Sequence, residues 1–242
     1  MLKRIQPSTE TIRKRSERLR SFRLLEPVAG PTMGGLEPGN SKTGTSGSKA
    51  ATVLVWNLPA VVTCPGASQW CLSHCYNGDD RPTTYPVSLW QANWHDYEQR
   101  RGQLKMHISA QLLAAAPPAA VRLHSSGDFF SEDYIQFWTD ICSHFCQVAF
   151  WAYTRSWVQP HLRPHLEELR RLGNVQLFAS HDSSMPEPPT DWRVSHISTD
   201  RDAVLTRLVC PEQTNQTPNC ASCGYCFQAP NERFQDVTFY EH

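Results

Sequence analysis

The chain has 242 residues, with 23 acidic and 23 basic residues and a formal net charge of zero. With this balance, no whole-molecule field demands nucleic acid or membrane as a partner, and a chain of this length can bury a sizeable core without disulfides or metal. The N-terminus lacks the apolar stretch of a secretory signal, and the longest apolar stretch, residues 112–121, is too short to span a bilayer. We therefore expect a cytoplasmic protein with no membrane partner.

The first segment of the chain is basic. Residues 3–23 carry eight Lys or Arg against two Glu, and Ser8 or Thr9 can cap a helix that ends near Phe22. Such a helix can bind nucleic acid, or it can be a solvated helix that folds against the domain, and both interpretations stay open. Residues 30–49 are rich in Gly, Ser, Thr and Pro, so we take residues 1–50 as a basic helix followed by an irregular connection.

From residue 51 the pattern changes to strands that alternate with helices. Predicted strands cover 52–58, 120–124, 148–153, 175–180, 193–197 and 203–209, and predicted helices cover 87–115, 131–145 and 162–172. Ser131 is the predicted N-cap of the second helix, because carboxylates follow it in the first turn. Repeated βα alternation predicts an α/β fold with a parallel sheet, open or curled into a partial (β/α) barrel, over residues 51–209.

Four successive predicted strands end in polar residues. The strand ends are His124–Asp128, Tyr153–Ser156, Ser180–Asp182 and Ser198–Asp200. Because β/α barrels build their active sites at the carboxyl ends of the strands, we expect these segments on one functional rim. Tyr153 and Arg155 are candidates to hold a carboxylate or the substrate, or they pack in the core. His124, His181 and Asp182 are weaker acid/base candidates.

The chain contains nine cysteines, an odd number that argues against a closed disulfide framework. Two groups have the spacing of metal ligands, since short gaps let several sulfurs converge on one centre. The first cysteine group is Cys64, Cys71 and Cys75, and the second, in the C-terminal segment 210–242, is Cys210, Cys220, Cys223 and Cys226. Three thiolates leave one iron of a 4Fe–4S cluster open, whereas four close it and suit electron transfer or structure. Cys142 and Cys146 are expected to be buried apolar residues.

Four sequence motifs occur in a recognisable order. They are TCPGASQWCLSHCYN from residue 63, VRLHSSGDFFSEDY from 121, FWAYTRSW from 150, and CPEQT followed by CASCGYC between 210 and 226. In these motifs the chain resembles the bacteriophage "gene product 88" family, which is in turn similar to radical SAM enzymes and to spore-photoproduct-lyase-like phage proteins. The resemblance implies a radical-SAM-like partial barrel and a host-cytoplasmic location.

The resemblance also implies a cofactor arrangement. The first cysteine group would hold a 4Fe–4S cluster with one open iron, to which S-adenosylmethionine (SAM) can bind. Ser126, Gly127 and Asp128 stand where radical SAM proteins bind the SAM amino group, so Asp128 is the expected contact, or it has a helix-capping role. The spacing C-x6-C-x3-C departs from the usual C-x3-C-x2-C pattern of radical SAM enzymes. This departure weakens the expectation that the cluster uses SAM, whereas cluster binding is still expected.

We therefore predict an iron–sulfur protein of radical SAM type, with Asp128, Tyr153 and Arg155 as its catalytic residues, one or two 4Fe–4S clusters and an electron donor. Its substrate would be a small molecule or a macromolecule. One alternative is an iron–sulfur redox or structural protein without SAM chemistry. The other is a phage protein that binds nucleic acid through its basic helix and carries zinc at the second cysteine group.

Overall fold

A computed structural model of the chain describes residues 29, 32–44, 52–75, 87–200, 208–228 and 236–241. Within these residues seven strands form a single sheet, and their spatial order is their order in the sequence. The strands are β1 (Glu37–Pro38), β2 (Thr52–Trp56), β3 (Ala119–Leu123), β4 (Ala149–Thr154), β5 (Val175–His181), β6 (Arg193–Ser198) and β7 (Val237–Tyr240). β1 runs antiparallel to β2, and all other neighbours are parallel. The predicted α/β class with a parallel sheet is confirmed.

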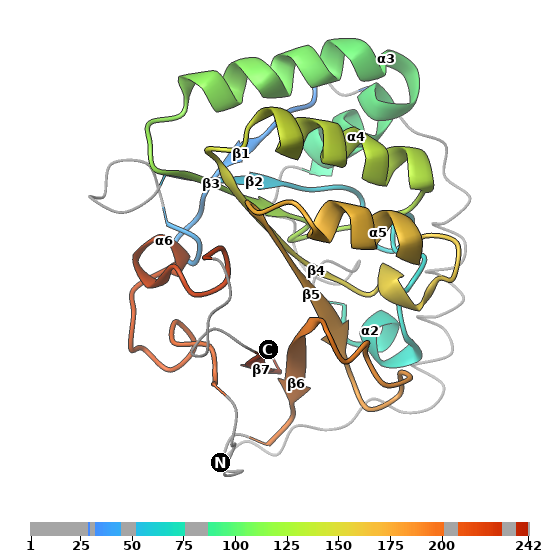
Figure 1. Cartoon of the computed structure of the whole chain (residues 1–242), viewed down its shortest axis with the longest axis vertical. Helices are drawn as coiled ribbons and strands as arrows, with labels where there is room; N and C mark the ends of the chain where they lie inside the picture. The colour runs from blue at the N-terminus through green and yellow to red at the C-terminus, as the bar shows by residue number, and fades with distance from the viewer. Residues whose placement is uncertain are drawn as a thin grey trace.

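The described helices connect the strands or cover the sheet. They are α2 (Gln69–Ser73), α3 (Val87–Ala114), α4 (Glu132–His144), the 3₁₀ helix η1 (Ser156–Val158), α5 (Arg163–Arg170) and α6 (Cys220–Cys223). Helices α3, α4 and α5 lie together on one side of the sheet, whereas α6 and its flanking loops lie on the other (Figure 1). A sequential strand order with its long helices on one side suits a partial barrel. The radical-SAM-like barrel itself stays a prediction.

Strand β4 shows how both faces of the sheet are buried. Phe150 and Ala152 pack among the helix residues, on what we call the helix face. Trp151 and Tyr153 point the other way and pack against the C-terminal segment, on what we call the inner face. Burial on both sides explains why this strand reads as a continuous apolar run.

Helix α4 begins where the sequence predicts. Ser131 is its N-cap, and the Ser131 side chain accepts a hydrogen bond from the Tyr134 backbone N–H at 3.2 Å. Glu132 and Asp133 lie in the first turn, where a negative charge opposes the helix dipole. The predicted N-cap is therefore confirmed.

Some predictions differ from the structure. Cys142 is fully buried as predicted, but Cys146 is exposed, because helix α4 ends at His144 and its periodicity no longer orients the chain. The short strands β1 and β7 are absent from the sequence prediction. The predicted basic helix and most of the predicted strand 203–209 lie outside the described residues. Among those that are described, no helix is both long and apolar enough to cross a membrane.

Candidate functional site

The first cysteine group lies in the connection that follows β2. Cys64 sits in a turn of this loop, Cys71 lies in α2, and Cys75 comes just after its end. The charges of Cys71 and Cys75 both act on Cys64, and Cys75 also acts on Cys71, so the three thiols lie close together. Burial raises the pKa of the Cys64 thiol well above its usual value and that of Cys71 to about 11, and the neighbouring thiols raise both further. The fold thus gathers three partly buried thiols that a bound cation would deprotonate.

The backbone around Cys64 is strained and supplies a hydrogen bond to its sulfur. The Val61 N–H donates to the Cys64 Sγ at 3.3 Å, and Val61 itself has a φ of 69°, which is unusual for a β-branched residue. Gly127, at φ 81°, packs so closely that a Cβ there would stand 2.6 Å from the Leu58 Cβ. Strained backbone of this kind persists where the surrounding structure fixes it, and it gathers at functional sites.

Asp128 lies beside the first cysteine group and joins two strand ends. Its Oδ1 accepts from the Phe129 N–H at 2.8 Å and from the Thr154 hydroxyl at 2.6 Å, and its Oδ2 accepts from the Arg155 N–H at 2.8 Å. Burial raises the pKa of Asp128, although these hydrogen bonds act to lower it. The negative charge of Asp128 acts on Cys64. Its contact with a SAM ammonium group stays a prediction.

Arg155 is buried and forms an ion pair with Asp182 at the end of β5. Arg155 Nη1 also lies 3.3 Å from the Ser68 Oγ, and Ser68 donates to Asp182 Oδ2 at 2.6 Å. Although burial acts to raise it, hydrogen bonds from Ser184 and Ser68 hold the pKa of Asp182 below its usual value. Arg155 and Asp182 therefore contact each other and also Ser68, which lies between Cys64 and Cys71 in the sequence.

Three polar atoms at the carboxyl ends of β3 and β5 are buried without a hydrogen-bond partner among the described residues. They are the Ser126 hydroxyl, the His124 Nδ1 and the His181 Nε2. The other ring nitrogen of His124 bonds to the Tyr134 hydroxyl at 2.7 Å, and burial lowers the pKa of His124 to about 3. Buried polar atoms are normally paired, so unsatisfied ones at a strand edge mark a place where a ligand or water can bind.

The second cysteine group lies on the inner face. Cys220 and Cys223 begin and end α6, and the Cys210 N–H donates to the Thr238 carbonyl at 2.9 Å. Cys210 acts electrostatically on both Cys220 and Cys226, so the structure places it with the second group. Burial raises the pKa of Cys226 to about 12 and also raises that of Cys220.

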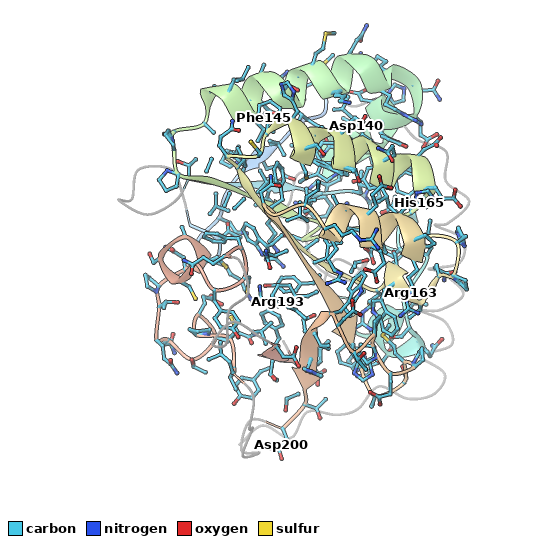
Figure 2. The ribbon with its side chains drawn as sticks, in the orientation of Figure 1. Asp140, Phe145, Arg163, His165, Arg193 and Asp200 are labelled. Atoms are coloured by element: carbon cyan, nitrogen blue, oxygen red, sulfur yellow. The ribbon has the colours of Figure 1, made fainter. Side chains whose placement is uncertain are left out.

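Cationic side chains surround this second group. Arg122 and Lys42 oppose the rise in the pKa of Cys220 that burial causes, and Arg193 does the same for Cys226. Figure 2 shows Arg193 between the sheet and the C-terminal segment, where its guanidinium lies 4.1 Å from the Phe178 ring centre. Positive charge next to thiols stabilises their anionic forms. The inner face thus suits a centre of net negative charge.

Tyr153 contacts the second cysteine group, whereas the charge of Arg155 acts on Cys71 of the first. The Tyr153 side chain is partly buried on the sheet's inner face, and its hydroxyl hydrogen-bonds to Cys226. The Arg122 guanidinium lies 5.6 Å from the Tyr153 ring centre. The two predicted catalytic residues are therefore associated with different thiol groups.

Sequence reasoning missed four residues near the thiols: Ser68, Lys42, Arg122 and Arg193. Ser68 had a readable signal, since a serine directly before a short helical run is a common N-cap. The three cations had none, because they come from separate strands and a distant loop. No three His, Cys, Asp or Glu side chains in the described ranges have the geometry to hold one metal ion.

A family model described as Gene product 88 matches residues 35–229. The chain belongs to the Gene product 88 family. The match includes both cysteine groups of this family member and all four of its motifs. The predicted family is thereby confirmed.

Two curated phage proteins are similar to this Gene product 88 family member. The Gene 88 protein of Mycobacterium phage D29 is 25% identical over 193 residues, which cover 68% of this chain and 78% of the relative. The Gene 88 protein of Mycobacterium phage L5 is 26% identical over 195 residues, covering 68% and 77%. Both relatives support the predicted phage origin. No solved structure matches the chain, and the predicted relationship to radical SAM enzymes stays a prediction.

Proposed function

We propose that this Gene product 88 family member is an iron–sulfur protein that acts in the host cytoplasm. The first cysteine group would hold a 4Fe–4S cluster with one open iron, and the second would hold a closed centre. The observation that carries the proposal is the gathering of seven cysteines into two groups, each with thiols close enough to perturb one another's pKa. Clusters of thiolates are the ligands that iron–sulfur centres use.

A zinc ion and an iron–sulfur cluster place different demands on their thiolate ligands. One zinc ion needs every ligand sulfur at about 2.3 Å from a common point. A cubane cluster binds each thiolate through a different iron, so its ligands stand farther apart. Groups of three and of four thiols that act on one another electrostatically supply the ligands of an open and of a closed cluster. The Val61 N–H, which donates to Cys64, is also the kind of hydrogen bond that tunes a cluster's potential.

The rim beside the first cysteine group suits a polar ligand. An open iron there would bind the amino and carboxylate groups of SAM and supply the electron that cleaves it. Ser126 and His124 carry buried atoms without partners among the described residues, and they end the strand where SAM is expected. On this proposal Ser126 and Gly127 line the SAM side, while Asp128 fixes the ends of β3 and β4 around it. Arg155 places positive charge near Cys71.

Metal and sulfide analysis of anaerobically purified protein tests the proposal. We expect iron, acid-labile sulfide and a broad visible absorption band from sulfur-to-iron charge transfer. Zinc without iron or sulfide would refute the iron–sulfur assignment and support the zinc-stabilised alternative. Cys71→Ala should remove the open cluster and Cys223→Ala the closed centre, whereas Cys146→Ala is the matched control because Cys146 is exposed and outside both groups.

Experiments with SAM distinguish a radical-SAM-type enzyme from an electron carrier. Binding of SAM to an open iron should change the EPR signal of the reduced cluster, and reduction should release 5′-deoxyadenosine and methionine. If a fully iron-loaded protein shows neither response, its role is redox or structural. Nucleic acid stays a proposed partner of the basic segment 3–23. Its binding should fall steeply with salt and vanish when residues 1–22 are deleted.

A further inference from the structure

We propose that Ser68, Arg155 and Asp182 are positioning residues that hold the first cysteine group ready for its cofactor before the cofactor arrives. The identity of that cofactor rests on the proposed function. The contacts that position the cysteines are made by the chain without any cofactor. It gives these three residues, whose side chains contact one another, a shared role that their sequence positions do not indicate.

Ser68 is the point at which the network meets the cysteines. Its Oγ accepts from the Cys71 backbone N–H at 3.0 Å and so caps α2, the short helix that contains Cys71. The same hydroxyl donates to Asp182 Oδ2 at 2.6 Å. A five-residue helix is far too short to be stable alone, so its conformation depends on such tertiary contacts.

Asp182 and Arg155 fix Ser68 from the far side of the loop. Asp182 uses Oδ1 to accept from both the backbone N–H and the hydroxyl of Ser184, at 2.9 Å and 2.5 Å, which leaves Oδ2 for Ser68 and Arg155. Arg155 is in turn held by its backbone N–H, which donates to Asp128 Oδ2 at 2.8 Å. The network therefore runs from the ends of β3, β4 and β5 into the cysteine loop.

The loop is also packed against the Arg155 segment at the level of the backbone. A Cβ at Gly66 would stand 2.1 Å from the Arg155 carbonyl oxygen, so only glycine permits this approach. Gln159 Nε2 donates to the Pro65 carbonyl at 2.8 Å. The chain directly after Cys64 thus has one fixed path, and Cys71 is fixed by Ser68.

A fixed loop lowers the cost of loading the cofactor. Ligands that are already in place lose little conformational freedom when they bind, which is the general advantage of a preorganised site. Loss of the network should therefore open the loop in the metal-free protein and weaken cofactor retention in the loaded protein. The first effect does not depend on which metal the site takes.

Cysteine alkylation in the metal-free full chain, followed site by site by mass spectrometry, measures the first effect. Ser68→Ala should speed iodoacetamide alkylation of Cys71 by about fivefold, the order of change expected from losing an N-cap. Asp182→Asn should speed it by about tenfold or more, since it removes hydrogen bonds to a charged group. Ser68→Thr keeps the capping hydroxyl and should restore the wild-type rate. Exposed Cys146 is the internal reference in every sample.

Ser131→Ala is the matched control, because Ser131 caps α4 in the same way but lies outside this network. If Ser131→Ala speeds Cys71 alkylation as much as Ser68→Ala does, the effect is global destabilisation and the positioning role is refuted. An unchanged rate in Ser68→Ala and Asp182→Asn, or no rescue by Ser68→Thr, would refute it too.

Release of iron from the loaded protein to a chelator gives the second readout, in which Ser68→Ala should accelerate release and Ser68→Thr should not. A wild-type protein that takes up no iron would overturn the proposed function. In that case the alkylation rates still decide whether the three residues position the loop.

Discussion

Asp128→Asn tests whether the Asp128 carboxylate is a structural tie between two strand ends. The substitution keeps the shape and removes one acceptor. The least costly orientation keeps the amide oxygen at the Oδ1 position, where it accepts from Phe129 and Thr154, and turns the NH₂ toward the Arg155 N–H. A buried donor then faces a donor, which costs about 1–3 kcal/mol. Relief of the buried charge offsets part of this cost, so we expect a net loss of roughly 1–2 kcal/mol of unfolding free energy.

The pH dependence of this difference has a defined sign. Burial raises the pKa of Asp128 in the folded state, so the folded protein keeps its proton at a pH where the unfolded chain has lost it. The wild type therefore loses stability as pH rises from the unfolded pKa of about 4 through the folded pKa. The neutral Asn has no such loss. The stability difference between wild type and Asp128→Asn should narrow as pH rises across this window.

Urea unfolding followed by tryptophan fluorescence, at several pH values, measures both effects. Asp140→Asn is the control, because Asp140 is half-exposed on α4 and accepts from Lys105 at 2.8 Å and Gln136 at 2.9 Å. Exposed pairs of this kind contribute about 0–1 kcal/mol. Equal effects of the two substitutions would refute the structural role. Loss of SAM binding with unchanged stability would instead show that Asp128 contacts SAM directly.

Three further predictions concern other residues of the core and the rim. Gly127→Ala should lower the unfolding free energy by more than about 1 kcal/mol, because φ is 81° and the new Cβ would stand 2.6 Å from Leu58; a thermal melt equal to wild type would contradict this. Burial lowers the pKa of His124 in the folded protein to about 3, so its imidazole stays neutral there. The stability that it contributes should be lost as pH falls below its unfolded pKa of about 6.5. His124→Gln should therefore flatten the fall of the unfolding free energy in acid titrations. Cys142→Ser should destabilise by about 1–3 kcal/mol in urea because it buries a hydroxyl, whereas Cys146→Ser should have no measurable effect.

The fold was predictable where local pattern and tertiary environment agree. The apolar run of β4 and the capping signal at Ser131 each specify a local structure, and the fold keeps it. β1 has two residues and forms only by pairing with β2, so no local sequence pattern predicts it. The exposure of Cys146 was mispredicted because helix α4 ends at His144, two residues before Cys146.

The candidate site was predictable as a set of residues but not as a set of contacts. The spacing of the cysteines shows which thiols belong together, and the structure gathers them accordingly. Arg155 and Asp182 are 27 residues apart, and a polar residue at a strand end can face a ligand, solvent or another strand end equally well. Their pairing arises from the neighbouring positions of β4 and β5, which only the folded sheet provides.

The inner face of the sheet has a consequence for biosynthesis. Its apolar side chains, such as Val55 and Trp151, are covered by residues around α6, and the sheet is completed by β7. Both of these segments leave the ribosome after the other strands and the three long helices. Until then the apolar inner face of the incomplete sheet is exposed on the nascent chain. Chaperones can bind this face, and it can cause aggregation. The thiols of the second cysteine group emerge in the same late segment, so on the proposed function their centre would be loaded only when the core closes.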